Sequence, residues 1–99
     1  MTIKKFEEIL LNKYGTSILD TLKCSSRIER YCFLRQIYAY ICWQNNMKIE
    51  DIANKLNRHR TYIYHLLKQY RNNLKGDNKF KDLHYSLLKN TIYYSNNNY

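Results

Sequence analysis

The sequence of 99 residues has no proline, only two glycines and no long run of apolar residues. Because proline is absent, a helix can continue until glycine, asparagine or aspartate ends it. A membrane-spanning helix needs about 18 or more apolar residues in succession, and no segment provides them. The charged opening, MTIKKFEEILLNKYG, also lacks the apolar core of a signal peptide. We therefore expect neither a membrane span nor an export signal.

The three cysteines, Cys24, Cys32 and Cys42, are odd in number and include no CxxC pair. This spacing fits neither a disulfide framework nor a zinc ribbon, and His59 and His65 have no cysteine nearby in the sequence, so we expect no metal. Reduced thiols are typical of a cytosol-like compartment. The abundant Asn (12) and Tyr (11) have AT-rich codons, which favours a phage or an AT-rich bacterium. We expect a cytoplasmic location, in a bacterial cytosol or, for a phage protein, in that of its host.

The sequence also lacks the motifs of common enzymes. There is no GxxxxGK[ST] motif, so a phosphate-binding loop for ATP is missing. The carboxylate pairs Glu7-Glu8 and Glu50-Asp51 are adjacent in sequence, and adjacent residues on a helix do not face each other. No Ser, Cys or His set has the spacing of a nucleophile with its base. We expect no enzymatic activity and no cofactor.

Positive charge is the dominant feature of the composition. Lys and Arg number 17 and Asp and Glu number 8, a net charge of +9. Residues 1–56 hold 9 basic and 6 acidic side chains (+3), and residues 57–99 hold 8 and 2 (+6). Such a balance predicts a polyanionic partner, nucleic acid first and an anionic membrane surface second. The aromatic content of 15% excludes a chain that is disordered throughout.

The hydrophobic spacing predicts an all-α fold, a bundle of five to six helices, because apolar residues recur with a helical period and never alternate. Gly15, Asn45-Asn46 and Gly76 separate the helices. Ser26 with Glu29 has the form of a capping box. We expect one domain over residues 1–90 and a disordered Asn/Tyr tail over residues 91–99. The expected helices cover residues 2–14, about 18–22, 26–44, 49–56, 60–74 and 79–90.

Residues 49–67, IEDIANKLNRHRTYIYHLL, have the pattern of a helix-turn-helix. Small Ala53 stands where two helices would touch, and Leu56 closes the first helix. Asn57 tolerates the positive φ that the turn needs. Ile63 and Leu67 return to pack the second helix against the first. This pattern, in register without a gap, favours DNA docking over a merely solvated helix face.

The second helix of this unit carries a basic stripe. Between residues 57 and 75 there are five basic side chains and no acidic one. Lys and Arg neutralise phosphates and release counterions, and Arg or His at a helix N-terminus can reach base edges in the major groove. The five basic residues are Arg58, Arg60, Lys68, Arg71 and Lys75. The stripe consists of the first four together with His59, Thr61, Tyr64 and His65.

Residues 56–65, LNRHRTYIYH, resemble the recognition-helix signature of the C-terminal DNA-binding domain of the bacterial replication initiator DnaA, approximately Arg-Asp-His-Ser/Thr-Thr-Val-x-His. Arg58, Thr61 and His65 match by identity. Residues 35–40 (RQIYAY) resemble the family's Arg-Gln-x-Ala-x-Tyr run, and residues 12–27 and 75–88 resemble its short helix with a basic stretch and its final helix. The resemblance covers about residues 3–89 and implies a DnaA-like, Trp-repressor-like fold that binds duplex DNA.

The resemblance implies specific contacts. Arg35 would enter the minor groove, and His59, Arg60 and Thr61 would read bases in the major groove. His59 and Arg60 stand where the family has Asp and His, so the usual acceptor for cytosine is missing and Arg60 favours guanine. Arg58 would stand beside them at the start of the recognition helix, and Lys48 would touch the DNA backbone. Tyr62 and His65 would touch phosphates or flanking bases. As phosphate anchors we expect Lys48, Arg58, Lys68 and Arg71.

Three functions stay open from the sequence. The first is sequence-specific binding of duplex DNA by a phage or accessory regulator of replication or transcription. The second is binding of RNA or single strands through basic and aromatic side chains. The third is a protein-interaction module that keeps the fold. A homodimer or a larger replication or transcription partner fits the small interface of a single domain. We expect Trp43 in the core or at its edge rather than stacked on a base.

Overall fold

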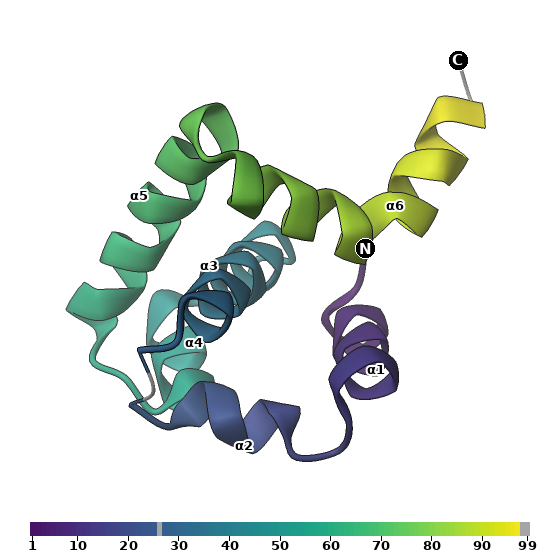
Figure 1. Cartoon of the computed structure of the whole chain (residues 1–99). Coiled ribbons are helices and arrows are strands. Elements are labelled where there is room, and N and C mark those ends of the chain that lie inside the picture. Colours follow the sequence, from purple (N-terminus) through teal and green to yellow (C-terminus); the bar gives the residue numbers. More distant parts are fainter. Residues whose placement is uncertain (26, 98–99) are drawn as a thin grey trace.

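The computed structural model describes the backbone of residues 1–25 and 27–97 and the side chains of residues 1–25 and 27–88. The described part is all-α, as predicted, and contains six helices (Figure 1). Its helices lack the combination of length and apolar character that crossing a membrane demands. The helices are α1 (Ile3–Tyr14), α2 (Ile18–Lys23), α3 (Glu29–Gln44), α4 (Ile49–Leu56), α5 (Arg60–Gly76) and α6 (Asn78–Asn97).

The helices begin and end close to the predicted residues, with two differences. Thr2 caps α1, and Gly15 ends it at φ 94°. α3 begins at Glu29, later than the predicted capping box, whose Ser26 lies outside the described residues. The α6 helix continues to Asn97, beyond the helix end expected near residue 90, and no glycine or proline follows Gly76 to stop it. Residues 98–99 lie outside the described residues.

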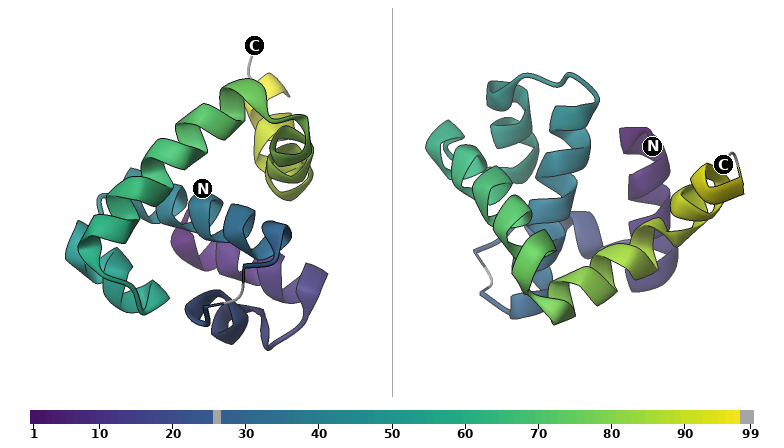
Figure 2. Two further views of the ribbon diagram at one scale, coloured as in Figure 1. Left: turned by 60° about the vertical axis from the view of Figure 1, so that its left-hand side comes forward. Right: turned by 90° about the horizontal axis from the view of Figure 1, so that it is seen from above.

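Helix α3 forms the centre of the molecule. Both views of Figure 2 place it between α5 and α1. Its side chains between Phe33 and Cys42 are buried, with the single exception of half-buried Tyr40. The ring of Tyr40 stacks on that of Tyr70 from α5, with 4.0 Å between the centroids. A helix buried on nearly all sides must find internal partners for every polar side chain it carries.

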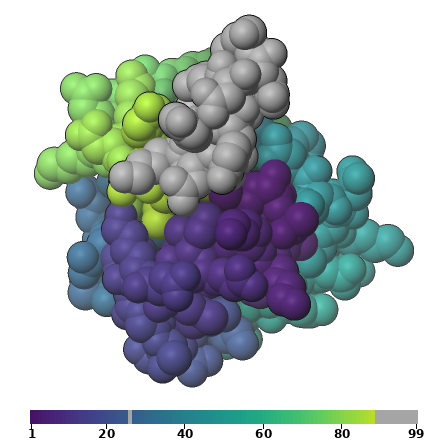
Figure 3. Space-filling view, turned by 90° about the vertical axis from the view of Figure 1, so that its right-hand side faces the viewer, coloured from purple at the N-terminus to yellow at the C-terminus, as the bar shows by residue number. Residues whose placement is uncertain are grey.

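Helix α6 returns over the core after a sharp turn. Asp77 caps it by accepting a hydrogen bond from the Phe80 backbone N–H at 2.9 Å. Phe80 is fully buried, and the His84 ring nitrogen lies 2.7 Å from the Tyr70 hydroxyl. Burial lowers the pKa of His84, so the ring that meets Tyr70 is neutral at neutral pH. Figure 3 shows α1 beside the start of α6, on the side of the molecule away from α5.

The turn between α4 and α5 has the geometry that the sequence predicted. Asn57 adopts the left-handed conformation, with φ 53° and ψ 49°. Ala53 and Leu56 on α4 and Ile63 and Leu67 on α5 are all buried. The two helices are therefore joined by residues 57–59 and held together by the apolar contacts expected of a helix-turn-helix.

Replacing Asn57 by alanine should lower the free energy of unfolding by about 1–2 kcal/mol, because a Cβ without a local hydrogen-bonding group is strained in this conformation. The matched variant Asn57→Gly should leave stability within about 0.5 kcal/mol of the wild type, since glycine has no Cβ. Urea unfolding followed by circular dichroism measures both. Equal losses for alanine and glycine would show that the side chain, not the backbone conformation, matters at this turn.

Candidate nucleic-acid interface

The outward side of α5 is basic along its length. Its inward side is buried through Ile63, Leu66, Leu67 and Tyr70. No acidic side chain occurs from residue 57 to residue 76. A helix that shows only neutral and positive groups to solvent is suited to a polyanion. We call the following exposed side chains the α5 face: Arg60, Thr61, Tyr64, His65, Lys68, Arg71 and Lys75.

The N-terminus of α5 is capped by a histidine. The Nδ1 atom of His59 accepts a hydrogen bond from the Thr61 backbone N–H at 3.2 Å and lies 3.1 Å from the Thr61 hydroxyl oxygen. Both side chains are exposed, so their remaining groups face solvent. The sequence predicted His59 as a base reader but missed this capping contact. Its position directly before the first helical residue was the available signal.

Arg60 stands in the first turn of α5, opposite a carboxylate from α4. Its Nη1 atom lies 3.6 Å from Oε1 of Glu50, and the two side chains are 63% and 73% exposed. An open groove lies between α4 and the start of α5, and both side chains border it. It is lined by Glu50, Ala53, Asn54, Arg58, His59 and Arg60. The sequence did not bring Glu50 to this site.

The predicted minor-groove contact of Arg35 is wrong for this structure. The Arg35 side chain is 1% exposed. Its Nε donates to the Leu22 carbonyl at 2.8 Å, and one Nη donates to the Cys24 carbonyl at 2.6 Å. Carbonyls at the end of a helix have no intrahelical donors, and a guanidinium carries five N–H groups in a fixed fork. Arg35 therefore joins the end of α2 to the central helix instead of reaching DNA.

Arg58, a predicted phosphate contact, also binds the end of α2, so its guanidinium already has partners within the fold. Its Nη1 donates to the Lys23 carbonyl at 2.8 Å, and its Nη2 donates to the Cys24 carbonyl. The guanidinium also lies 5.6 Å from the ring centroid of half-buried Tyr62. Arg35 and Arg58, which we call the arginine pair, thus share the Cys24 carbonyl. Arg35 joins the end of α2 to α3, and Arg58 joins it to the helix-turn-helix.

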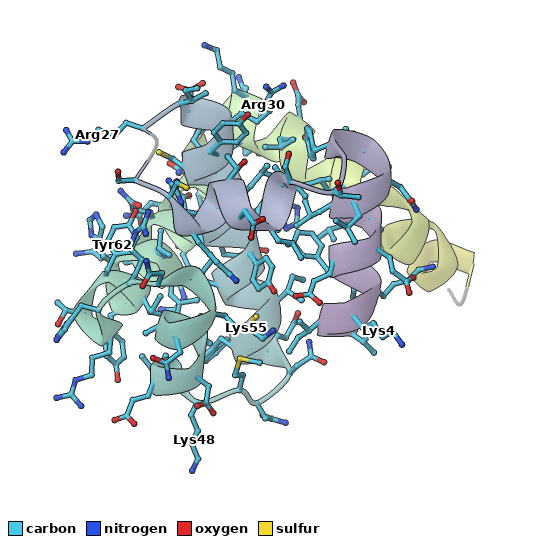
Figure 4. The ribbon with its side chains drawn as sticks, turned by 90° about the horizontal axis from the view of Figure 1, so that it is seen from below. Lys4, Arg27, Arg30, Lys48, Lys55 and Tyr62 are labelled. Atoms are coloured by element: carbon cyan, nitrogen blue, oxygen red, sulfur yellow. The ribbon has the colours of Figure 1, made fainter. Side chains whose placement is uncertain are left out.

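Of the remaining predicted backbone contacts, Tyr62 is half-buried, and the other four lie at the surface. Lys48 precedes α4, and its side chain projects from one edge of the molecule in Figure 4. Lys68 and His65 belong to the exposed α5 face. The Arg71 guanidinium lies 5.8 Å from the ring centroid of Trp43, which is 43% exposed. Trp43 therefore stands at the edge of the core, as expected, but it also borders the α5 face.

The described residues contain no group of three or more His, Cys, Asp or Glu side chains placed to hold a metal ion. All three cysteines have free thiols, with Cys24 exposed and Cys42 buried. Burial raises the pKa of Cys42 to about 12, so this thiol stays protonated and behaves as a core residue. The chemistry of the surface is therefore that of hydrogen-bond donors, positive charge and aromatic rings.

Comparison with known proteins does not identify a family for this chain. No protein-family model matches the chain, and no solved structure matches it significantly. The resemblance to the DnaA C-terminal domain stays a prediction, based chiefly on residues 56–65 and 35–40. Two of the contacts that it implies, by Arg35 and Arg58, are occupied within the fold.

Proposed function

We propose that this chain is a sequence-specific binder of duplex DNA that inserts α5 into the major groove in the manner of a DnaA-like helix-turn-helix. The observation that carries the proposal is the α5 face, which is exposed, basic and free of acidic side chains from residue 57 to residue 76. It follows directly on the left-handed turn at Asn57. An α-helix fits the major groove of B-form DNA, and the first residues of such a helix meet the base edges.

The proposed contacts divide by position along the helix. His59, Arg60 and Thr61 stand at the N-terminus of α5 and are assigned to bases. Lys68 and Arg71 lie further along the α5 face and are assigned to phosphates. Phosphate contacts set the position of the protein on DNA, and base contacts set the sequence preference. Lys48, Tyr62 and His65 complete the phosphate contacts, whereas the arginine pair acts inside the fold. Regulation of replication or transcription, in a phage or as an accessory factor, is the role we assign to such a module.

A second candidate function is binding of single strands or RNA. Tyr64 is 60% exposed and Trp43 is 43% exposed, and the Arg71 guanidinium lies 5.8 Å from the ring centroid of Trp43. Aromatic rings beside positive charge provide stacking platforms for unpaired bases. Competition distinguishes the two functions, since single strands should displace a duplex from the protein only if this second candidate is right.

The decisive experiment is selection of binding sites from a random duplex library at about 150 mM salt, the physiological ionic strength. We expect the wild type to enrich one motif. Arg60→Ala should relax that motif at one or two positions, at a cost of about 1–3 kcal/mol for the lost base contact. The control Lys4→Ala removes one exposed charge from α1, which Figure 4 shows on the opposite side of the molecule from Tyr62.

Lys4→Ala should leave the enriched motif unchanged. If neither the wild type nor the control enriches any motif, sequence-specific duplex binding is excluded. If the wild type enriches a motif that Arg60→Ala reproduces unchanged, the protein binds a specific site but Arg60 does not read it. A protein-interaction module would show weak duplex affinity that is indifferent to the loss of Arg60.

A further inference from the structure

The groove between α4 and the start of α5 contains a carboxylate that the proposed function does not use. Glu50 and Arg60 both border this groove, with 3.6 Å between Oε1 and Nη1. A carboxylate at a DNA-binding surface repels phosphates and weakens binding to every sequence. Its presence beside the proposed base reader therefore calls for a reason other than affinity.

Stability does not explain the placement of Glu50. Both partners of the ion pair are mostly exposed, and exposed ion pairs contribute little to folding. The helix dipole favours an acid anywhere in the first turn of α4, and Asp51 already supplies one there. The dipole gives no reason for an acid to face Arg60.

The geometry instead suits control of the Arg60 side chain. A flexible exposed arginine can reach phosphates or several bases, and its planar fork discriminates guanine only when it is held in one orientation. Glu50 engages the Nη1 end of the fork, which leaves other N–H groups of Arg60 for a base edge. Because the two residues come from different helices, the helix-turn-helix packing sets their relative position.

We propose that Glu50 is a positioning residue for sequence specificity, whose carboxylate orients the Arg60 guanidinium towards one base pair and penalises binding elsewhere. This inference rests on the proposed function, because it assigns a role within the same DNA-binding site. It predicts an unusual pair of effects, since loss of Glu50 raises affinity for arbitrary sequences and lowers discrimination at the position that Arg60 reads.

The test measures affinity and base preference separately. Fluorescence anisotropy with a labelled duplex gives the Kd for the selected site, for the same site with the Arg60-dependent base pair changed, and for an unrelated sequence. We expect Glu50→Ala to tighten binding to the unrelated duplex by about two- to five-fold, as for removal of one exposed charge. The preference for the correct base pair should fall by about five-fold or more.

The matched control is Asp51→Ala, which removes the neighbouring exposed acid from the same helical turn. It should tighten binding to all three duplexes alike and keep the base preference. The double variant Glu50→Ala/Arg60→Ala should show the same preference as Arg60→Ala alone, because Glu50 acts only through Arg60. Thermal unfolding of every variant checks that each one remains folded.

Three results would overturn the inference: Glu50→Ala keeps the full preference, Asp51→Ala relaxes the same base position, or Glu50→Ala reduces the preference further when Arg60 is already absent. The base preference of the wild-type protein tests the proposed function independently of Glu50. A wild type with no base preference removes the proposed function and the role of Glu50 together, whereas a wild type with a preference leaves only Glu50 in question.

Discussion

Replacing Arg35 by methionine should lower the free energy of unfolding by about 2–5 kcal/mol, because two carbonyls at the end of α2 lose charged donors inside the fold. The side chain is 1% exposed and donates to the carbonyls of Leu22 and Cys24. Methionine keeps much of the apolar volume and removes the guanidinium, so the loss reports on hydrogen bonding more than on packing. Small domains have about 5–15 kcal/mol of stability in total, so this one change removes a large share.

Urea unfolding of Arg35→Met, Arg58→Met and Arg27→Met measures the effect and its controls. Arg58→Met should cost less than Arg35→Met, since Arg58 is only half-buried. Arg27 projects into solvent from the connection between α2 and α3, so its replacement should change stability by no more than about 0.5 kcal/mol.

The same variants separate the sequence-based role of Arg35 from the structural one. If Arg35 contacts the minor groove, Arg35→Met should weaken DNA binding and unfold at the wild-type urea concentration. The structure predicts the opposite result. Arg35→Met should unfold at a lower urea concentration than the wild type, and it should keep the wild-type affinity for DNA under conditions in which it is folded. An unchanged urea midpoint would therefore refute the buried role of the arginine pair.

The second large effect concerns DNA affinity. Replacing Lys48, Lys68 and Arg71 together by alanine should weaken duplex binding by about 100-fold, because phosphate contacts supply most of the sequence-independent affinity. The three side chains are exposed and lie at the start of α4 and along α5. The slope of log K against log salt should become shallower by about 2.7, from about 0.9 for each of three phosphates.

The matched control removes the same charge from another surface. Lys4, Lys5 and Lys13 are exposed on α1, away from the α5 face. Their replacement by alanine lowers the net charge by the same three units and should change the salt slope by less than about 1, since long-range effects are screened within about 10 Å. Titrations between about 50 mM and about 200 mM salt compare the two variants. Equal losses in both would mean that net charge, rather than the α5 face, attracts the DNA.

Local sequence signals predicted the helix-turn-helix well. The turn at Asn57 was predictable because asparagine tolerates the left-handed conformation, and the burial of Ala53 and Ile63 followed from helical spacing. These properties depend on a few neighbouring residues, and the structure confirms them. The start of α3 was predicted too early because a capping box describes only local hydrogen bonds, and the helix begins at Glu29.

The assignment of individual arginines was less predictable. Arg35, Arg58 and Arg60 are chemically identical, and the sequence assigned each of them to DNA. Two of the three bind carbonyls of α2, and every residue offers such a carbonyl whatever its side chain, so no motif reveals the partner. The ion pair of Arg60 with Glu50 joins two different helices, so the sequence did not predict it either.

By itself, the sequence determined the helical class, the left-handed turn and the basic character of α5, because periodicity, backbone preference and charge are properties of local chain segments. Only the tertiary structure decided which positive groups remain available to a partner. Burial of α3 encloses the Arg35 side chain, Arg58 binds the carbonyls at the end of α2, and Arg60 remains at the surface beside Glu50. That selection depends on distances between segments far apart in the chain, which no local pattern encodes.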